Sequence, residues 1–384
     1  MSNIPLSLYI HMPWCVKKCP YCDFNSHAVK GELNEMEYVA ALLADLDYEL
    51  SRSPEREVES IFIGGGTPSL FSIRGITDLL AGVRRRLSLV EGAEVTLEAN
   101  PGTLEAGRYS GYREAGVNRL SLGVQSFDAA ALNRLGRIHG SEQAVAAVEA
   151  ARSAGFENFN IDLMFGLPGQ TVGSARQDVE TAIRLAPAHL SYYQLTLESG
   201  TLFYHQPPVL PEDEVLWEIQ NEGQLLLQEG GYQQYEVSAY AQSGRRCRHN
   251  LNYWRFGDYL GIGAGAHGKM TDSHSGRVER RRRKPNPSDF MRHAGAAEAV
   301  AGGRILDRED LIIEFLMNAL RLTHGFELSL FSERTGLESD FLLSRLQLPQ
   351  VRGLLTLEKG RACPTPLGAR FLDDLLLLMS EPHC

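Results

Sequence analysis

Short apolar segments alternate with amphipathic stretches along the first half of the chain. Six segments between residues 6 and 197 have the length and composition of β-strands: residues 7–11, 59–64, 94–99, 118–123, 159–164 and 190–195. Apolar residues at helical spacing over 36–50 and 174–186 predict helices between them. Strands that alternate with helices favour parallel βαβ units. The pattern predicts an α/β fold, a partial (β/α)6 barrel rather than a closed eight-stranded one, with ligands at the carboxyl ends of the strands.

The character of the chain changes after Pro207-Pro208. A helix over 212–229 is followed by a stretch rich in His and Gly at 247–268, and then by the basic segment RVERRRRKPNPSD at 277–289, whose composition indicates an exposed loop. From residue 307 the pattern is mostly helical, and residues 352–379 predict a hairpin followed by a helix, as in a winged-helix domain. We expect a core barrel over 1–240, a connection with the basic loop over 241–300, and a mostly helical, winged-helix-like C-terminal domain over 301–384.

The net charge and the length of the apolar runs limit the classes of function that fit the chain. Asp and Glu number 48 against 38 Lys and Arg, a net charge of −10, which argues against nucleic acid as a partner because phosphate binding needs a basic face. The chain opens without the basic and apolar regions of a secretory signal, and no apolar run approaches the ~18 residues of a membrane helix. We therefore expect a cytoplasmic protein without membrane insertion.

Three of the six cysteines lie within eight residues, directly after the first predicted strand. Cys15, Cys19 and Cys22 form the spacing C-x3-C-x2-C in HMPWCVKKCPYCDFNSH, over the loop 11–27. Thiolates are soft ligands suited to zinc or to iron–sulfur clusters. A zinc site requires a fourth ligand, which His11 or His27 could supply. A 4Fe–4S cluster usually takes four cysteines, so three would leave one iron open to an exchangeable ligand.

The C-x3-C-x2-C loop after the first strand resembles the signature of the radical S-adenosylmethionine (SAM) superfamily. In that family the open iron binds the amino and carboxylate groups of SAM, and an electron from the cluster cleaves the sulfonium to a 5′-deoxyadenosyl radical. The resemblance assigns Cys15, Cys19 and Cys22 to a 4Fe–4S cluster. The segment IFIGGGTPSL at 61–70 is similar to the glycine motif of the family, whose backbone contacts the SAM amino group, although a glycine cluster is also compatible with a plain turn.

Further polar residues fall at the ends of the predicted strands, in EANPGT (98–103), GVQSFD (123–128), LGRIHG (135–140) and DLMFGLPGQT (162–171). Any one of them is compatible with a structural role, but four at successive strand ends favour ligand contact. Together these motifs resemble the coproporphyrinogen III dehydrogenase (HemN-like) branch of the superfamily over essentially the whole chain. The resemblance implies one or two SAM sites lined by Tyr9, Tyr21, Gly65, Gly66, Thr67, Glu98, Gln125, Arg137 and Asp162.

Within this branch the chain departs from the dehydrogenase itself. Phe24 stands where that enzyme has a fourth cysteine, and fourteen residues precede Cys15 where the enzyme has a long N-terminal extension. The motifs CPYCDFNSH, GGGTPSL, LGRIHG and HNLNYWR resemble instead the HemW group of heme chaperones. That resemblance implies binding of heme and its transfer to heme-acceptor proteins such as respiratory membrane enzymes. A radical SAM oxidoreductase acting on a tetrapyrrole is the alternative, and a homodimer stays open.

A candidate heme ligand lies in RRCRHNLNYWRFGDYLGIGAGAHG. The imidazole of His249 suits heme iron, the rings of Tyr253 and Trp254 can stack on a flat macrocycle, and Cys247 is a rival axial ligand. Propionates could pair with the four arginines at 245, 246, 248 and 255. The residues alone favour a capped turn and core aromatics, whereas the HNxxYW resemblance favours heme. His267, in the following turn, we interpret as structural.

Overall fold

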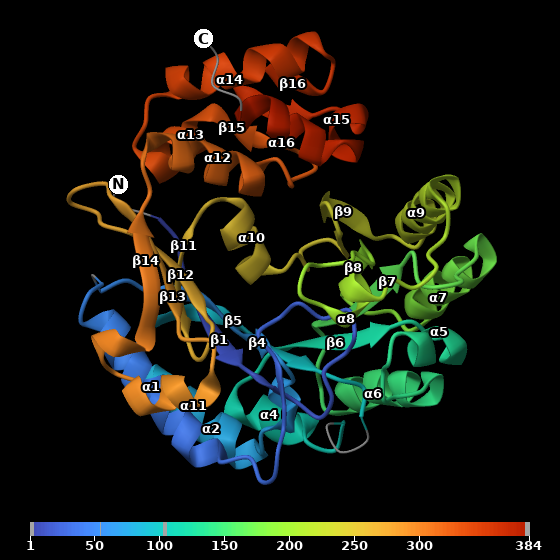
Figure 1. The fold of residues 1–384 in the computed structure, drawn as a ribbon, viewed down its shortest axis with the longest axis vertical. Helices are drawn as coiled ribbons and strands as arrows, with labels where there is room; N and C mark the ends of the chain where they lie inside the picture. Colours follow the sequence, from blue (N-terminus) through green and yellow to red (C-terminus); the bar gives the residue numbers. More distant parts are fainter. Residues whose placement is uncertain (1–3, 54, 103–105, 381–384) are drawn as a thin grey trace.

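A single twelve-stranded sheet organises the chain in the computed structural model, which describes residues 4–53, 55–102 and 106–380 (Figure 1). In spatial order its strands are β14 (Val300–Ile305), β13 (Val278–Arg283), β12 (His267–Thr271), β11 (Asp258–Ile262), β1 (Leu6–Met12), β4 (Val58–Gly65), β5 (Leu89–Ala99), β6 (Arg119–Gln125), β7 (Phe159–Phe165), β8 (His189–Gln194), β10 (Ala239–Ala241) and β9 (Gln233–Glu236).

The six strands expected from the sequence are β1, β4, β5, β6, β7 and β8, and each pairs with the next in parallel. The α/β barrel prediction is thus confirmed. A further parallel strand, β11, lies on the outer side of β1 in the register Leu6↔Asp258, although it comes from much later in the chain. Antiparallel strands extend both edges, and the sheet stays open between β14 and β9.

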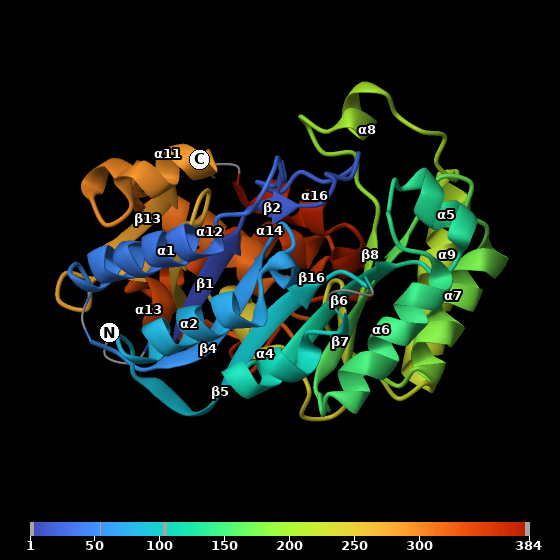
Figure 2. The ribbon, with the colours of Figure 1, turned by 90° about the horizontal axis from the view of Figure 1, so that it is seen from below.

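Helices cover the outer face of the curved sheet, as Figure 2 shows. They are α1 (Glu35–Leu50), α2 (Ile73–Arg84), α4 (Tyr109–Ala115), α5 (Ala129–Arg134), α6 (Ser141–Ser153), α7 (Val172–Arg184) and α9 (Asp213–Glu229). The helices predicted over 36–50, 174–186 and 212–229 are therefore present as α1, α7 and α9. Of the helices in the described part of the chain, none has the length and apolarity that crossing a bilayer requires.

Side chains alternate between the two faces of each parallel strand. Leu8 of β1 and Leu120 of β6 belong to the hydrophobic core beneath the helices. Their neighbours Tyr9, Arg119 and Ser121 point to the concave face, where they line a cavity. Parallel strands covered on both faces usually read as continuous apolar runs. Here every second residue is polar or aromatic because the inner face surrounds ligand-sized space instead of a packed core.

The basic segment at 277–289 corrects one expectation. It is not an exposed loop: Val278–Arg283 form the inner strand β13, between β12 and β14. The Arg283 side chain is 1% exposed and lies 2.8 Å from Asp45 of α1, and it also contacts Glu49. Arg281 bonds Glu49 at 2.8 Å. Composition alone suggested that this segment is exposed to solvent. The acidic partners of its arginines, Asp45 and Glu49, lie on a helix more than two hundred residues earlier in the chain.

The C-terminal residues form a mostly helical domain of winged-helix type. Its elements are α12 (Arg308–Ala319), β15 (Phe326–Glu327), α13 (Leu328–Thr335), α14 (Ser339–Val351), β16 (Leu355–Glu358), β17 (Arg361–Pro364), α15 (Pro366–Arg370) and α16 (Leu372–Ser380). The hairpin β16–β17 and the helices after it match the sequence expectation. Phe315 and Leu346 belong to its buried apolar cluster.

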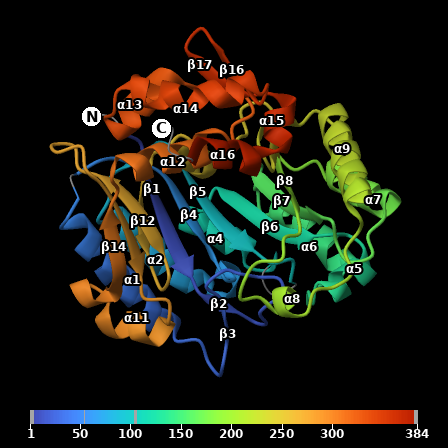
Figure 3. The same ribbon diagram turned by 45° about the horizontal axis from the view of Figure 1, so that its top comes forward.

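The remaining elements lie between and around these layers: β2 (Trp14–Cys15), β3 (His27–Ala28), η1 (Pro68–Leu70), α8 (Leu202–His205), α10 (Arg248–Trp254), α11 (Pro287–His293) and η2 (Ala297–Ala299). The loop with β2 and β3, together with α8, lies at one end of the strands, and the C-terminal domain lies at the opposite end (Figure 3). Helix α10 lies between the sheet and α12. The two ends of the strands therefore differ: the loop with β2 and β3 lies at one end, and the C-terminal domain lies at the other.

Candidate cofactor site

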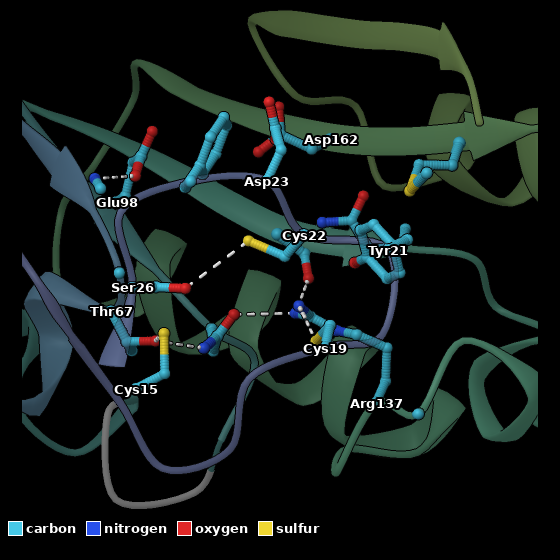
Figure 4. A pocket seen from close by; sticks show the side chains of 18 of the residues that line it. Cys15, Cys19, Tyr21, Cys22, Asp23, Ser26, Thr67, Glu98, Arg137 and Asp162 are labelled. Atoms are coloured by element: carbon cyan, nitrogen blue, oxygen red, sulfur yellow. Dashed lines mark hydrogen bonds between the residues drawn. The ribbon is translucent and has the colours of Figure 1, made fainter. Parts of the chain in front are cut away.

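The cysteine loop connects β1 to α1 and is fastened at its base. Its short strands β2 and β3 pair with each other, and Asn25 donates hydrogen bonds of 2.9 Å to the carbonyls of Ala264 and Pro285. Cys15, Cys19 and Cys22 all line one cavity of about 310 Å³ at the carboxyl end of the parallel strands (Figure 4). The loop thus presents three thiols to one shared cavity.

Each of the three sulfurs has a hydrogen-bonding group directed at it. The Thr67 hydroxyl donates to Cys15 Sγ at 3.4 Å, an Arg137 guanidinium nitrogen lies 3.8 Å from Cys19 Sγ, and the Ser26 hydroxyl lies 3.7 Å from Cys22 Sγ. Burial raises the pKa of the Cys15 and Cys22 thiols, so these groups keep their protons until a metal replaces them. Donors around the sulfurs are what thiolate ligands of an iron–sulfur cluster require.

Neither histidine considered for the zinc alternative lines the cavity with the cysteines. The residues that line the 310 Å³ cavity, within the described ranges, include neither His11 nor His27. Both ring nitrogens of His11 are engaged, by the Tyr9 hydroxyl at 3.0 Å and the Asn25 carbonyl at 2.9 Å. Among the described residues no three His, Cys, Asp or Glu side chains converge on a single ion. A multi-iron cluster, by contrast, takes its cysteines at separate corners, so the donor set fits a cluster.

The glycine motif braces the cysteine loop. Gly65 has φ +112°, and a Cβ there would lie 2.4 Å from the His11 ring, while a Cβ on Gly66 would lie 2.6 Å from the Trp14 carbonyl. The N–H groups of Gly66 and Thr67 donate at 2.7 Å to the carbonyls of Met12 and Trp14. Only glycine permits such close approach. Gly65, Gly66 and Thr67 also line the cavity, as expected, but their N–H groups are used within the protein.

Two half-buried carboxyl groups, Glu98 and Asp162, line the cavity. Glu98 accepts a hydrogen bond from the Gly65 N–H at 3.0 Å, and burial, with Asp162 nearby, raises the pKa of Glu98 to about 7. Burial also raises the pKa of Asp162, although Ser121 and Asn160 donate to it at 3.2 and 2.7 Å. A cationic ligand would favour the ionised form of both groups. This part of the cavity is suited to a positively charged ligand.

The other residues predicted for SAM lie on the remaining walls, except for one. Arg137 donates to the Gly123 carbonyl at 2.6 Å and to Asn100 at 2.8 Å. Gln125, held at φ +70°, accepts from the Tyr193 hydroxyl at 2.8 Å. The predicted residues that line this cavity are Tyr21, Gly65, Gly66, Thr67, Glu98, Gln125, Arg137 and Asp162. Tyr9 lines the neighbouring cavity instead.

Several lining residues were missed, among them Asn100 and Tyr193. Asn100 stood inside the quoted EANPGT, whose Thr103 lies outside the described residues, and its place after a strand end was a usable signal. Tyr193 lies in β8 beside Tyr192, which belongs to the buried core, and no local signal distinguished the tyrosine that lines the cavity from the one that does not.

A second cavity of about 760 Å³ adjoins the first. Asp23, Phe24, Gly65, Glu98, Ser121 and Asp162 line both cavities. One wall of the larger cavity is aromatic and the other is polar. The aromatic wall consists of Tyr9, Phe62, His249, Tyr253, Trp254 and Tyr259, and the polar wall of Arg119, Asn160, His189 and Ser191. The size is in the range of small-molecule sites, and the two walls suit a ligand that is flat and apolar at one end and polar at the other.

His249 lies in the aromatic wall, near the start of α10. It is 1% exposed, its Nδ1 is 3.0 Å from the Ser60 hydroxyl, and its Nε2 is 3.0 Å from the Tyr253 hydroxyl. Burial, with a contribution from the Arg119 charge, lowers the pKa of His249 to about 3. The imidazole is therefore neutral, the form that binds metals, and an iron would have to replace one of these hydrogen bonds.

The structure places the other residues considered for heme binding. The four arginines at 245, 246, 248 and 255 do not line this cavity: Arg248, for example, donates to the Gly92 carbonyl at 3.0 Å. Cys247, the rival ligand, lies behind the wall, where its Sγ donates to Glu94 at 3.5 Å and burial raises its pKa to about 12. His267, which we interpreted as structural, is among the residues that line this cavity. Which of these side chains reach the cavity depends on the packing of α10 and on strand register, and the spacing of the residues in the sequence specifies neither.

Comparisons with known proteins agree with this arrangement. Residues 9–186 match the model of the radical SAM superfamily, and residues 306–371 match that of the HemN C-terminal domain. The chain is 51% identical to the heme chaperone HemW of Escherichia coli over 97% of its own length and 98% of that protein. It is 46% identical to the heme chaperone HemW of Haemophilus influenzae, over 97% of each chain.

A more distant relative and a solved structure extend the comparison. The radical S-adenosyl methionine domain-containing protein 1, mitochondrial, of Bos taurus is 36% identical over 97% of this chain and 86% of its own. The structure of coproporphyrinogen III oxidase (HemN) from Escherichia coli superimposes with a TM-score of 0.83 over 98% of this chain and 90% of the other. At 23% sequence identity, this superposition shows a common fold and no more.

Proposed function

The chain belongs to the HemW heme chaperone family of the radical SAM superfamily, and on that basis we propose that it holds heme beside a cluster-bound SAM and delivers the heme to acceptor proteins. Cys15, Cys19 and Cys22 would hold the 4Fe–4S cluster, and the cavity that they line would hold SAM. The cluster would supply the electron that cleaves a sulfonium bond. Heme would occupy the larger cavity, against the aromatic wall with His249.

The junction between the two cavities carries this proposal. Glu98 and Asp162 line both spaces, so a ligand in one lies against the same carboxyl groups as a ligand in the other. Binding in the two cavities is then coupled through the ionisation of shared groups. A protein that only stored heme would need no such contact, whereas a chaperone that loads or releases heme in response to SAM would use it.

Phe24 distinguishes this function from tetrapyrrole decarboxylation. It lines both cavities at their junction and is 57% exposed, and its phenyl ring offers no thiol or exchangeable proton. An apolar exposed ring at such a junction favours contact with a flat apolar ligand. The fold shared with coproporphyrinogen III oxidase does not by itself favour that activity, because one fold serves many reactions.

The expected cellular compartment follows from the chemistry of the thiols. The described cysteines at 15, 19, 22, 247 and 363 are free, and cluster ligands must remain reduced, which favours the cytoplasm. The acceptors would be proteins that require heme, such as respiratory membrane enzymes, reached from the cytoplasmic side.

An assay with anaerobically reconstituted protein tests the proposal. With cluster, SAM and reductant present, we expect bound heme to pass to an apo-acceptor such as apomyoglobin, and coproporphyrinogen III to remain unchanged over many enzyme equivalents. Formation of protoporphyrinogen IX at multiple turnovers would contradict the proposal and support the dehydrogenase. Failure to bind heme at all would contradict it as well.

A further inference from the structure

Arg119 begins β6 and is the largest fully buried side chain that lines the 760 Å³ cavity. Although it is 2% exposed, its guanidinium makes no hydrogen bond and no ion pair with any described residue, and its Nε is buried without a partner. Buried guanidinium groups are otherwise almost always paired, because burying an unpaired charge is costly. Arg119 therefore has hydrogen-bonding capacity that the protein itself does not use.

The nearby acids do not fill this capacity. Glu94 accepts from Cys247 Sγ at 3.5 Å and from the N–H groups of Arg248 and His249 at 3.0 and 3.3 Å, at the start of α10. Asp162 accepts from Ser121 and Asn160. Both acids are close enough to raise the pKa of Arg119 against the effect of burial, so the guanidinium stays charged, but neither forms an ion pair with it. Nearby negative charges thus stabilise the positive charge of Arg119, while its N–H donors have no partner among the described residues.

The surroundings of Arg119 define the chemistry of the missing partner. Its neighbours on the polar wall are Asn160 and His189, which are hydrogen-bonded to each other at 2.6 Å and are thus already committed. A planar fork of N–H donors matches a carboxylate, which accepts two parallel hydrogen bonds. The aromatic wall on the other side of the cavity suits the apolar body of the same ligand.

We propose that Arg119 binds a carboxylate of an amphipathic ligand whose flat body lies on the aromatic wall, which for heme is a propionate. This inference rests on the proposed function, because it places heme in the larger cavity. It replaces the four arginines at 245, 246, 248 and 255 as the partner of the propionate, since those side chains do not line the cavity. Glu98, which shares the space, opposes the carboxylate least when it is protonated, and burial favours that state.

A comparison of heme with its dimethyl ester isolates the carboxylate contact. The two ligands share the macrocycle and iron, but the ester has no propionate charge. We expect the wild-type protein to bind heme at least ~10-fold more tightly than the ester. Arg119→Met, which keeps the volume and removes the charge, should lower the affinity for heme at least ~10-fold and leave that for the ester unchanged. Each 10-fold corresponds to about 1.4 kcal/mol.

Arg246→Met is the matched control. Arg246 lies over the Tyr235 ring, 5.6 Å from its centroid, outside the cavity, so this variant should bind both ligands as the wild type does. Equal loss of heme and ester in Arg119→Met would overturn the inference and show a packing role. Wild-type binding without preference for heme would overturn it too, while the proposed function would stand. Binding of neither ligand by the wild type would instead contradict the proposed function.

Arg119→Lys keeps the test decisive if the Met variant does not fold, as judged by thermal unfolding and cluster content. Lysine retains the charge but loses the planar fork. It should weaken heme binding while leaving ester binding unchanged. A parallel loss of both ligands in this variant would overturn the inference.

Discussion

The backbone N–H of Gly65 donates a hydrogen bond of 3.0 Å to Oε2 of Glu98, and this contact joins the glycine turn to the junction of the two cavities. Gly65 itself packs against His11 at the entry to the cysteine loop. A single carboxyl group thus contacts the turn that braces the cluster loop and faces both ligand cavities. The protonation of Glu98 is consequently expected to affect both stability and ligand binding.

Replacement of Glu98 by Gln should stabilise the SAM-free protein at pH 8 and have little effect at pH 4.5. Folding raises the pKa of Glu98 from its ordinary 4.5 to about 7. Ionisation therefore opposes folding: the cost is absent below pH 4.5, grows between 4.5 and 7, and is complete above 7. Gln never ionises, so the gain at pH 8 should reach about 3 kcal/mol. Thermal unfolding at the two pH values measures it.

The exposed Glu91, on the same strand, provides the control for this experiment. Glu91→Gln should change stability equally and slightly at both pH values. A Glu98→Gln variant that is less stable than wild type at pH 8 would show that the carboxylate, and not the neutral acid, stabilises the junction.

Removal of any one of Cys15, Cys19 and Cys22 by substitution with Ala should abolish cluster retention. Three thiols are the minimum for a site with one open iron, and each lines the same cavity. Iron and sulfide content after anaerobic reconstitution measure the result. Cys247→Ala, Cys363→Ala and Cys384→Ala should retain the cluster, although Cys384 lies outside the described residues. Loss of the cluster from any of this second set would contradict the three-ligand assignment.

Arg283→Met should destabilise the protein by about 3–5 kcal/mol, because it removes the cation paired with the buried Asp45 and leaves the buried Glu49 paired with Arg281 alone. Arg282→Met is the matched control, since Arg282 is exposed on the same strand and should change stability by no more than ~0.5 kcal/mol. Chemical denaturation of the two variants gives the comparison. Equal effects would show that the pairs with α1 do not matter for stability.

His249→Ala should lower heme affinity at least ~10-fold, or about 1.4 kcal/mol, and shift the Soret band, if the imidazole binds iron. The cluster should remain, because it is held by another loop. Tyr253→Phe removes the hydroxyl that occupies Nε2, so it should preserve or increase heme affinity. Trp254→Ala should weaken binding without altering the iron-ligand spectrum.

Cys247→Ser is the control for this set and should leave the heme spectrum unchanged, because the sulfur lies against Glu94. A lost thiolate-type spectrum in this variant would move the axial ligand to Cys247. Wild-type heme binding in the Ala variants of both His249 and Trp254 would make this helix a packing element.

Several parts of the site were predictable because they depend on local pattern and on one rule of parallel sheets. The six strands, the cysteine loop and the glycine turn are contiguous in the chain. Glu98, Gln125 and Asp162 lie on three neighbouring strands, β5, β6 and β7, whereas Arg137, expected at a further strand end, lies in the turn after α5. They meet in one cavity because the carboxyl ends of parallel strands lie at the same edge of the sheet.

Other parts could not be read from the chain, since they depend on residues far apart in sequence. Arg119 lies at the amino end of its strand, where no rule predicts a ligand, and it becomes notable only because the fold leaves it unpaired. The strand β11 joins β1 by a register that no local signal specifies. The basic run at 277–289 looks solvated until α1 brings two acids to it.

The sequence by itself determined the element types, the loop with its three cysteines and most of the polar residues near the strand ends, because each is fixed by short spacings and by the period of two along a strand. The tertiary structure alone decided which inward side chains share a cavity and which charges find partners. Those outcomes depend on strand order and on register. A shift of one residue in the register would exchange the inner and outer faces of a strand.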